Sequence, residues 1–186
     1  MDISNYLSAK RVLVTGAGGS IGSELCRQIR QFNPAGLVML DIDDTAIQEL
    51  QLSLDGHGLL DNRSLVIASV RDAQRMVEVF ETHRPQVVFH AAALKHLPLL
   101  EQKPDEGFKT NTLCTLNVLE AAAATGVERV VNVSTDKAAD PTSVLGLTKR
   151  QAERLTASFA SAGVAGTYGS VRCGNVLGSR GSMLPS

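Results

Sequence analysis

The sequence lacks several features that mark common classes of protein. Its formal net charge is −1, which argues against a nucleic-acid partner because phosphate neutralisation needs clustered Lys and Arg. No apolar run reaches the length needed to span a membrane, and residues 1–10 lack the apolar core of a signal peptide. We therefore expect a cytoplasmic protein that binds no nucleic acid, with no membrane segment in this chain.

Cysteine is also scarce. Cys26, Cys114 and Cys173 are odd in number and widely spaced, so they indicate neither a disulfide framework nor a metal-binding motif. They are typical of reduced cysteines in a cytosolic protein, and we expect all three to fill core positions. The sequence predicts no metal site.

What is present indicates one ordinary folded domain of 186 residues, with 44% hydrophobic and 20% charged residues. Short apolar runs alternate with longer helix-like stretches. The predicted strands are 11–15, 36–41, 64–69, 86–91, 129–134 and 166–172, and the predicted helices are 21–32, 44–54, 72–83, 104–125 and 142–162. Most strands are nearly continuous apolar runs, typical of parallel strands buried on both faces. The alternation predicts an α/β fold, a doubly wound parallel sheet between two helical layers, which is a Rossmann fold.

The sequence ends at Ser186, soon after the predicted sixth strand and a loop. A dinucleotide-binding domain is nearly complete at that point. We therefore expect residues 1–186 to form an NAD-binding domain that is the amino-terminal part of a longer catalytic domain. Most of the substrate domain is then absent from this chain.

Three glycines, Gly16, Gly19 and Gly22, lie between the first predicted strand and the first helix. Glycines at this spacing permit a tight turn, close approach of the backbone to a pyrophosphate, and close packing of helix on strand. Asp41 ends the next strand, where a carboxylate bonds ribose hydroxyls and repels a 2′-phosphate. This favours NAD over NADP. The alternatives are an ordinary strand–helix turn and, for Asp41, a helix N-cap.

The next two strand ends extend this site. The third predicted strand ends near Ser69 and Val70, where an adenine ring would lie. The fourth ends in three small residues that leave room for the cofactor, namely Ala91, Ala92 and Ala93. Lys95 and His96 follow in a loop that we expect to face the crevice, where two basic groups suit an anionic substrate such as a nucleotide diphosphate. A solvated loop remains the alternative.

Four segments, residues 15–25, 90–122, 133–153 and 171–185, resemble the extended short-chain dehydrogenase/reductase superfamily. Within it they look like the polysaccharide-biosynthesis (CapD-like) branch of nucleotide-sugar 4,6-dehydratases. The resemblance implies a cofactor site made by Gly16, Gly19, Ser20, Ile21, Gly22, Asp41, Ser69, Val70, Ala91, Ala92, Ala93, Lys95, Ser134 and Lys149. It implies a catalytic set of Thr135, Asp136, Lys137 and Lys149, and substrate contacts from Lys95, Asn175 and Arg180. His96, beside Lys95, is a further substrate candidate because of its basic side chain.

Two positions depart from the superfamily's pattern. Ser69 stands where an Asp usually contacts adenine, and a serine can still form a hydrogen bond. Leu145 stands four residues before Lys149, where the superfamily has its catalytic tyrosine. The chain has only Tyr6 and Tyr168, and neither precedes a lysine by four residues. One branch of these dehydratases is similar in having an apolar residue there, and by that analogy Thr135 orients the C4 oxygen.

The resemblance implies dehydration of a nucleotide hexose: oxidation at C4, loss of water across C5 and C6, and return of the hydride to C6. We expect Asp136 to protonate the leaving hydroxyl and Lys137 to accept the C5 proton. Both roles need pKa values moved toward neutrality by burial and by each other's charge. The alternative is an exposed Asp–Lys turn without a chemical role.

The leading hypothesis is an NAD-dependent 4,6-dehydratase that acts on a UDP-N-acetylhexosamine. One alternative is a nucleotide-sugar C4 epimerase of the same superfamily. Another is a non-catalytic NAD-binding module, with which the missing tyrosine and the short chain are both consistent. We also expect a homo-oligomer, formed through the predicted helices 104–125 and 142–162.

Overall fold

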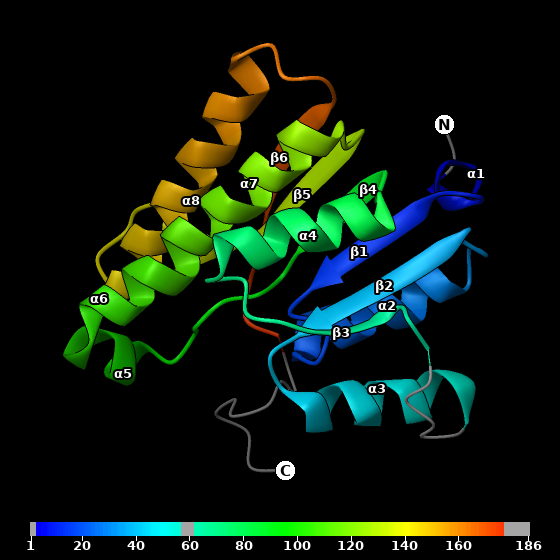
Figure 1. The fold of residues 1–186 in the computed structure, drawn as a ribbon. Helices are drawn as coiled ribbons and strands as arrows, with labels where there is room; N and C mark the ends of the chain where they lie inside the picture. Colours follow the sequence, from blue (N-terminus) through cyan, green and yellow to red (C-terminus); the bar gives the residue numbers. More distant parts are fainter. Residues whose placement is uncertain (1–2, 57–61, 177–186) are drawn as a thin grey trace.

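The computed structural model describes residues 3–56 and 62–176 (Figure 1). Six parallel strands form one sheet in the order β3-β2-β1-β4-β5-β6. The strands are β1 (Arg11–Thr15), β2 (Gly36–Asp41), β3 (Leu65–Ile67), β4 (Val87–His90), β5 (Arg129–Thr135) and β6 (Thr167–Cys173). The strand order reverses between β1 and β4, so the predicted doubly wound Rossmann fold is confirmed.

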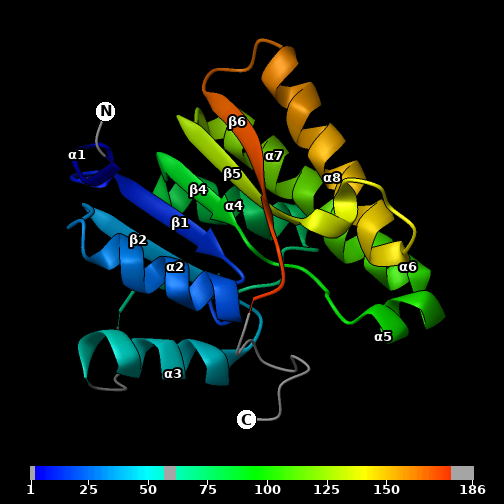
Figure 2. The same ribbon diagram turned by 180° about the vertical axis from the view of Figure 1, so that it is seen from behind.

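Helices cover both faces of the sheet (Figures 1 and 2). They are α1 (Ile3–Leu7), α2 (Ser20–Arg30), α3 (Asp44–Asp55), α4 (Ala73–His83), α5 (Leu97–Gln102), α6 (Pro104–Gly107), the π-helix η1 (Phe108–Leu113), α7 (Cys114–Thr125), the 3₁₀ turn η2 (Asp136–Ala138) and α8 (Val144–Ser161). Figure 2 shows α2 and α3 on one face, with α4, α7 and α8 on the other.

The strands alternate between two apolar cores. Leu13 points to the core under α4 and α7, where it packs in one cluster with Phe80 and Val118. Its neighbours Val12 and Val14 point to the opposite core, beneath α2 and α3. All three β1 side chains are fully buried. Burial on both faces explains why the parallel strands are continuous apolar runs in the sequence.

Short polar side chains fix where several helices begin. Asp43 accepts a hydrogen bond from the Ala46 N–H at the start of α3, and Ser143 accepts one from the Gly146 N–H at the start of α8. These N-caps satisfy N–H groups that the first turn of a helix leaves without a partner. Asp43 lies two residues after the end of β2, so its cap begins α3 directly beyond that strand end.

The structure differs from the predicted elements in a few places. The predicted helix 104–125 is three consecutive segments, α6, η1 and α7, with a π-helical middle. Helices α1 and α5 were not predicted, because each is about one turn long and has little periodicity. Cys26 and Cys114 are buried as expected, but Cys173 is partly exposed at the end of β6. The expectation that it fills the core was therefore wrong, since β6 is one of the two edge strands of the described sheet.

Candidate cofactor and active site

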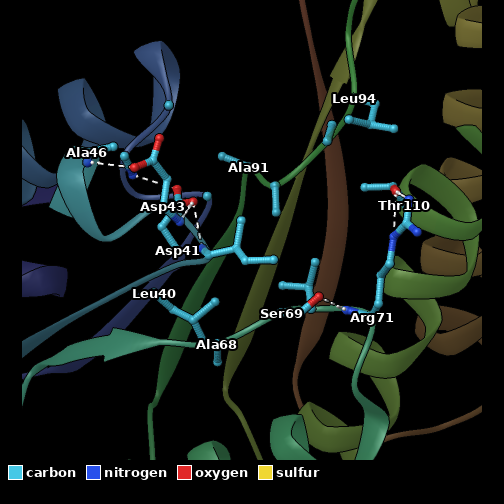
Figure 3. Close-up of a pocket in the computed structure, with 17 residues that line it drawn as sticks. Leu40, Asp41, Asp43, Ala46, Ala68, Ser69, Arg71, Ala91, Leu94 and Thr110 are labelled. Carbon is cyan, nitrogen blue, oxygen red and sulfur yellow. Dashed lines mark hydrogen bonds between the residues drawn. The ribbon is translucent and has the colours of Figure 1, made fainter. Parts of the chain in front are cut away.

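A cavity of about 490 Å³ lies at the carboxyl ends of the strands (Figure 3). Its walls come from the loops after β1, β2, β3 and β4 and from η1. The lining residues are Gly16, Gly18, Gly19, Leu40, Asp41, Ile42, Asp43, Ala46, Ala68, Ser69, Val70, Arg71, Ala91, Ala92, Ala93, Leu94 and Thr110. The cavity thus brings together most of the residues predicted for the adenosine and pyrophosphate part of a dinucleotide site.

Two glycines of the loop, Gly16 and Gly22, leave no space for a side chain. Gly16 has φ +70°, and a Cβ there would lie 2.5 Å from the Ala92 backbone nitrogen. A Cβ on Gly22 would lie 1.9 Å from the Gly16 carbonyl oxygen, so α2 packs directly on the loop. Ser20 and Ile21 open α2 and do not line the cavity. Their backbone lies where the amino end of a helix directs N–H groups and partial positive charge toward an anion.

Asp41 joins the end of β2 to the glycine loop. Its Oδ2 accepts a hydrogen bond from the Gly18 N–H at 2.8 Å, and its Oδ1 accepts from the Ile42 and Asp43 N–H groups at 2.7 and 3.1 Å. The cap of α3 is Asp43, not Asp41. The N-cap alternative for Asp41 is therefore wrong, and its carboxylate faces the cavity (Figure 3).

Arg71 forms the cavity wall opposite Asp41, and the sequence-based prediction missed it (Figure 3). Its guanidinium donates to Thr110 Oγ1 at 2.5 and 3.0 Å and pairs with Glu106 at 2.6 Å. Ser69, predicted to contact adenine, accepts a hydrogen bond from the Arg71 N–H at 3.2 Å. These bonds tie the loop after β3 to the helix that contains η1.

Hydrogen bonds hold the end of β4 and the loop that follows it. His90 is fully buried between Thr15 and Thr115, and burial lowers its pKa to about 3, so it is a neutral structural residue. Asn111, on the π-helical segment, forms hydrogen bonds with the backbone N–H and carbonyl of Leu94. Its Oδ1 accepts from the N–H at 2.9 Å, and its Nδ2 donates to the carbonyl oxygen at 3.0 Å. A π-helical segment at such a position is typical of functional sites.

Lys95 and His96 lie beyond the cavity. Both are exposed on the segment that leads into α5, and neither lines the cavity wall. The predicted substrate residue Asn175 lies after β6, where its Oδ1 accepts a hydrogen bond from Lys137 Nζ at 3.0 Å. Arg180 lies outside the described residues.

The predicted catalytic triplet begins at the carboxyl end of β5 and continues into η2. Thr135 Oγ1 donates to Asp136 Oδ1 at 2.9 Å, and Lys137 Nζ lies 3.1 Å from the same oxygen. The Thr135 hydroxyl and then the Lys137 ammonium lower the pKa of Asp136. The expected upward shift of the Asp136 pKa is therefore wrong here, because its side chain is 56% exposed and the opposite charges stabilise each other.

Lys149 lies beside the triplet on α8 and is buried, with 6% of its surface exposed. Its Nζ donates to the Val133 carbonyl oxygen at 2.8 Å. Burial lowers its pKa to about 8, against the raising effects of Glu153 and Cys173. Leu145 is also buried, one helical turn before Lys149. The side chain at the usual tyrosine position therefore packs as an apolar residue.

Ser134, predicted in the cofactor site, bonds elsewhere. It is buried, and its Oγ donates to Glu153 Oε1 at 2.7 Å. Neither Ser134 nor the triplet and Lys149 line the 490 Å³ cavity, whose walls come from the ends of β1 to β4 and from Thr110. The sequence-based prediction missed Glu153, because its partners come from strands that only the sheet register brings together.

The sequence profile of the family described as "Polysaccharide biosynthesis protein" matches residues 12–186. The chain belongs to this family. Among its relatives, the capsular polysaccharide biosynthesis protein CapD of Staphylococcus aureus is 44% identical over 98% of this chain and 31% of its own length. The expected similarity to the CapD-like branch is thereby confirmed.

Members of the wider family have different activities. A UDP-N-acetylglucosamine 4,6-dehydratase (inverting) of Campylobacter jejuni is 32% identical over 95% of this chain and 52% of its own length. A UDP-glucose 4-epimerase of Rickettsia rickettsii is 33% identical over 95% of this chain and 52% of its own length. The chain spans between about a third and about half of the length of these relatives. It is related to both nucleotide-sugar dehydratases and epimerases.

Solved structures agree with the fold. Pen from Bacillus thuringiensis matches with a TM-score of 0.85 and 34% identity, over 95% of this chain and 54% of that one. A UDP-glucose-4-epimerase from Stenotrophomonas maltophila, solved with bound NAD and a formylated UDP-arabinopyranose, matches with a TM-score of 0.72 and 27% identity, over 83% and 49%. Within residues 3–56 and 62–176, no helix combines the length and apolarity needed to cross a bilayer.

Proposed function

We propose that the protein is an NAD-dependent 4,6-dehydratase of a UDP-N-acetylhexosamine, and that this chain supplies its cofactor-binding and catalytic half. The observation that supports this most is the triplet Thr135–Asp136–Lys137 at the end of β5, beside the buried Lys149. The relationship to a UDP-N-acetylglucosamine 4,6-dehydratase supports the same activity.

The residues present fit NAD. The glycine cradle, where added Cβ atoms would collide with backbone, suits close approach of a pyrophosphate. Asp41 faces the cavity with a carboxylate that suits ribose hydroxyls and disfavours a 2′-phosphate. When bound, NAD would accept the C4 hydride of the sugar and return it at C6. Lys149, with a pKa of about 8, is mostly charged at neutral pH and can donate to the second ribose.

The Asp136–Lys137 pair holds the proton that the elimination needs. In the structure Lys137 Nζ lies 3.1 Å from Asp136 Oδ1, and the lowered pKa of Asp136 favours its carboxylate form. Transfer of one proton from Nζ to Oδ1 gives a carboxylic acid, which can protonate the leaving C6 hydroxyl, and an amine, which can accept the C5 proton. A substrate that excludes water from the pair favours this neutral form over the ionised one. Asn175 keeps Nζ in place by accepting a hydrogen bond from it.

The same residues argue against the C4 epimerase. An epimerase returns the hydride to C4 and needs no acid and base for C5 and C6. An adjacent Asp136 and Lys137 with a shared hydrogen bond is the pair that elimination requires. The missing tyrosine leaves Thr135 as the hydroxyl that can orient the C4 oxygen, and solvent as the acceptor of the C4 hydroxyl proton that is released when the hydride leaves.

Conversion of UDP-N-acetylglucosamine by the full-length protein tests this proposal. We expect a UDP-4-keto-6-deoxy sugar, identified by mass spectrometry and NMR. Lys137→Ala should abolish product formation. Lys137→Arg should do the same although it keeps the charge, because a guanidinium does not release its proton. Both variants should still bind NAD.

Other outcomes separate the alternatives. A C4 epimer as the only product would show an epimerase. NAD binding without turnover of any UDP-hexose would show a non-catalytic module. Full activity of Lys137→Arg would show that Lys137 is not the base. Assembly into a homo-oligomer through α7 and α8, and residence in the cytoplasm, stay predictions.

A further inference from the structure

Glu153 is a buried carboxylate that the proposed mechanism does not use. It lies on α8 with 9% of its surface exposed. Its Oε1 accepts from Ser134 Oγ at 2.7 Å and from Arg172 Nε at 2.8 Å. Its Oε2 accepts from Arg172 Nη2 at 2.7 Å and from Arg150 Nη1 at 3.2 Å. A buried carboxylate with this many charged and polar partners has a fixed position.

Two of these partners, Ser134 and Arg172, lie close in sequence to the proposed catalytic residues and to Asn175. Ser134 and Arg172 are register partners in β5 and β6, so both side chains point to the α8 face of the sheet. Ser134 immediately precedes the Thr135–Asp136–Lys137 triplet. Arg172 lies three residues before Asn175, which bonds Lys137 Nζ. By binding Ser134 and Arg172, Glu153 therefore holds the ends of β5 and β6 together. The triplet follows Ser134, and its partner Asn175 follows β6.

The charge of Glu153 also acts on Lys149, one helical turn earlier on α8. Two further titratable groups face Lys149: Cys173 from β6 and the neutral His90 from β4. In η2, which packs on α8, Asp136 and Lys137 pair with each other. Arg172, Ser134 and Arg150 lower the pKa of Glu153 to about 2, so it is ionised wherever Lys149 titrates. It opposes the burial that lowers the Lys149 pKa.

We propose that Glu153 is a positioning residue of the active site, which fixes the ends of β5 and β6 and serves as the countercharge for Lys149. The part that concerns Lys149 rests on the proposed NAD binding. Lys149 can then donate to the cofactor ribose as an ammonium, although it is buried. Glu153 itself touches neither cofactor nor substrate in this account.

Glu153→Gln tests the proposal, because the amide keeps the size of the side chain and loses its charge. The first measurement is the NMR titration of the Lys149 side chain in ¹³C-lysine-labelled protein, assigned with Lys149→Met. We expect the Lys149 pKa to fall by at least about one unit, given a charge one helical turn away in a poorly solvated site. Arg154→Ala, which removes an exposed cation from the same helix, is the matched control and should leave the titration near that of wild type.

The second measurement is the pH profile of NAD affinity. If the Lys149 pKa falls from about 8 by one unit, the charged fraction at pH 8 falls about fivefold, while at pH 6 it stays above about nine-tenths. Glu153→Gln should therefore bind NAD about fivefold more weakly at pH 8 and almost normally at pH 6. A purely structural defect would weaken binding equally at both pH values.

Glu153→Asp is a second variant that keeps the charge, so the role of the carboxylate can still be measured if Glu153→Gln does not fold. We expect its Lys149 titration to stay near that of wild type. The proposed countercharge role would be refuted if the Lys149 pKa is unchanged in Glu153→Gln, or if Glu153→Asp lowers it by the same amount. Wild-type protein that binds no NAD would refute the proposed function instead, while the Lys149 titration would still decide the role of Glu153.

Discussion

Replacing the buried Lys149 with methionine should stabilise the fold while it removes function. The folded-state pKa of about 8, against 10.5 for an unperturbed lysine, means that the charged form is disfavoured by burial. At about 1.4 kcal/mol per pKa unit, this costs about 3 kcal/mol at neutral pH. Lys149→Met removes that cost and fills the same space with an apolar side chain of similar length.

One loss offsets part of the gain. The variant leaves the Val133 carbonyl oxygen without the hydrogen bond from Lys149 Nζ, which costs about 1–3 kcal/mol. The favourable interaction of Lys149 with Glu153 is already included in the pKa of about 8, so its loss adds no further term. The expected net gain is about 1 kcal/mol, or an increase of about 2–4 °C in Tm for a chain of this size.

The pH dependence has a definite sign. Between pH 8 and 10.5 the unfolded chain binds the Lys149 proton more tightly than the folded one, so wild-type stability from this group rises with pH. The advantage of Lys149→Met should therefore be full below pH 8, fall as pH rises, and become a deficit of about 1–3 kcal/mol near pH 10.5, where only the lost Val133 hydrogen bond remains. Urea unfolding of both proteins at several pH values measures it. The exposed Lys103→Met is the control and should change stability by less than about 0.5 kcal/mol.

Two results would refute this reasoning. One is an unfolding free energy for Lys149→Met that lies below that of Lys103→Met at pH 7. The other is a stability difference that does not change between pH 8 and 10.5. In the same variant, NAD affinity should fall at least about tenfold, since the ammonium that donates to the ribose is gone. Opposite changes in stability and affinity would mark Lys149 as a residue retained for function.

The cofactor loop gives two further predictions. Gly22→Ala places a Cβ 1.9 Å from the Gly16 carbonyl oxygen. Calorimetry should therefore show that NAD binding is lost, and denaturation should show that the free energy of unfolding falls by about 2 kcal/mol or more. Gly169→Ala is the control and should change both little, because the space around its Cβ is open. Asp41→Asn keeps a hydrogen-bond acceptor and removes the charge, so the preference for NAD over NADP should fall about tenfold. An unchanged preference would mean that Asp41 does not face the ribose.

Much of the fold follows from the sequence, because its signals are local. The β1 and β2 boundaries match the predicted 11–15 and 36–41, since buried parallel strands are continuous apolar runs. The π-helical segment η1 did not follow, because nothing in the sequence periodicity marks its extra residue. Its shape depends on tertiary bonds, such as those of Asn111 to Leu94 and of Thr112 to Thr148.

The candidate site divides in the same way. Gly16 and Asp41 could be found from a short motif, because neighbouring residues in sequence form that part of the cavity. Arg71 and Glu153 could not, because their partners lie on other elements and meet them only through the sheet register and helix packing. The ionised state of Asp136 also depends on exposure, which a dipeptide Asp–Lys does not determine.

The most direct test of the proposed dehydration follows a label on the sugar. The full-length protein would be given UDP-N-acetylglucosamine deuterated at C4, in ordinary water, and the product examined by NMR. The account predicts a 4-keto-6-deoxy product whose C6 methyl group contains the deuterium, with a C5 proton that has come from solvent. Deuterium that stays at C4 of an epimerised or unchanged sugar would contradict it.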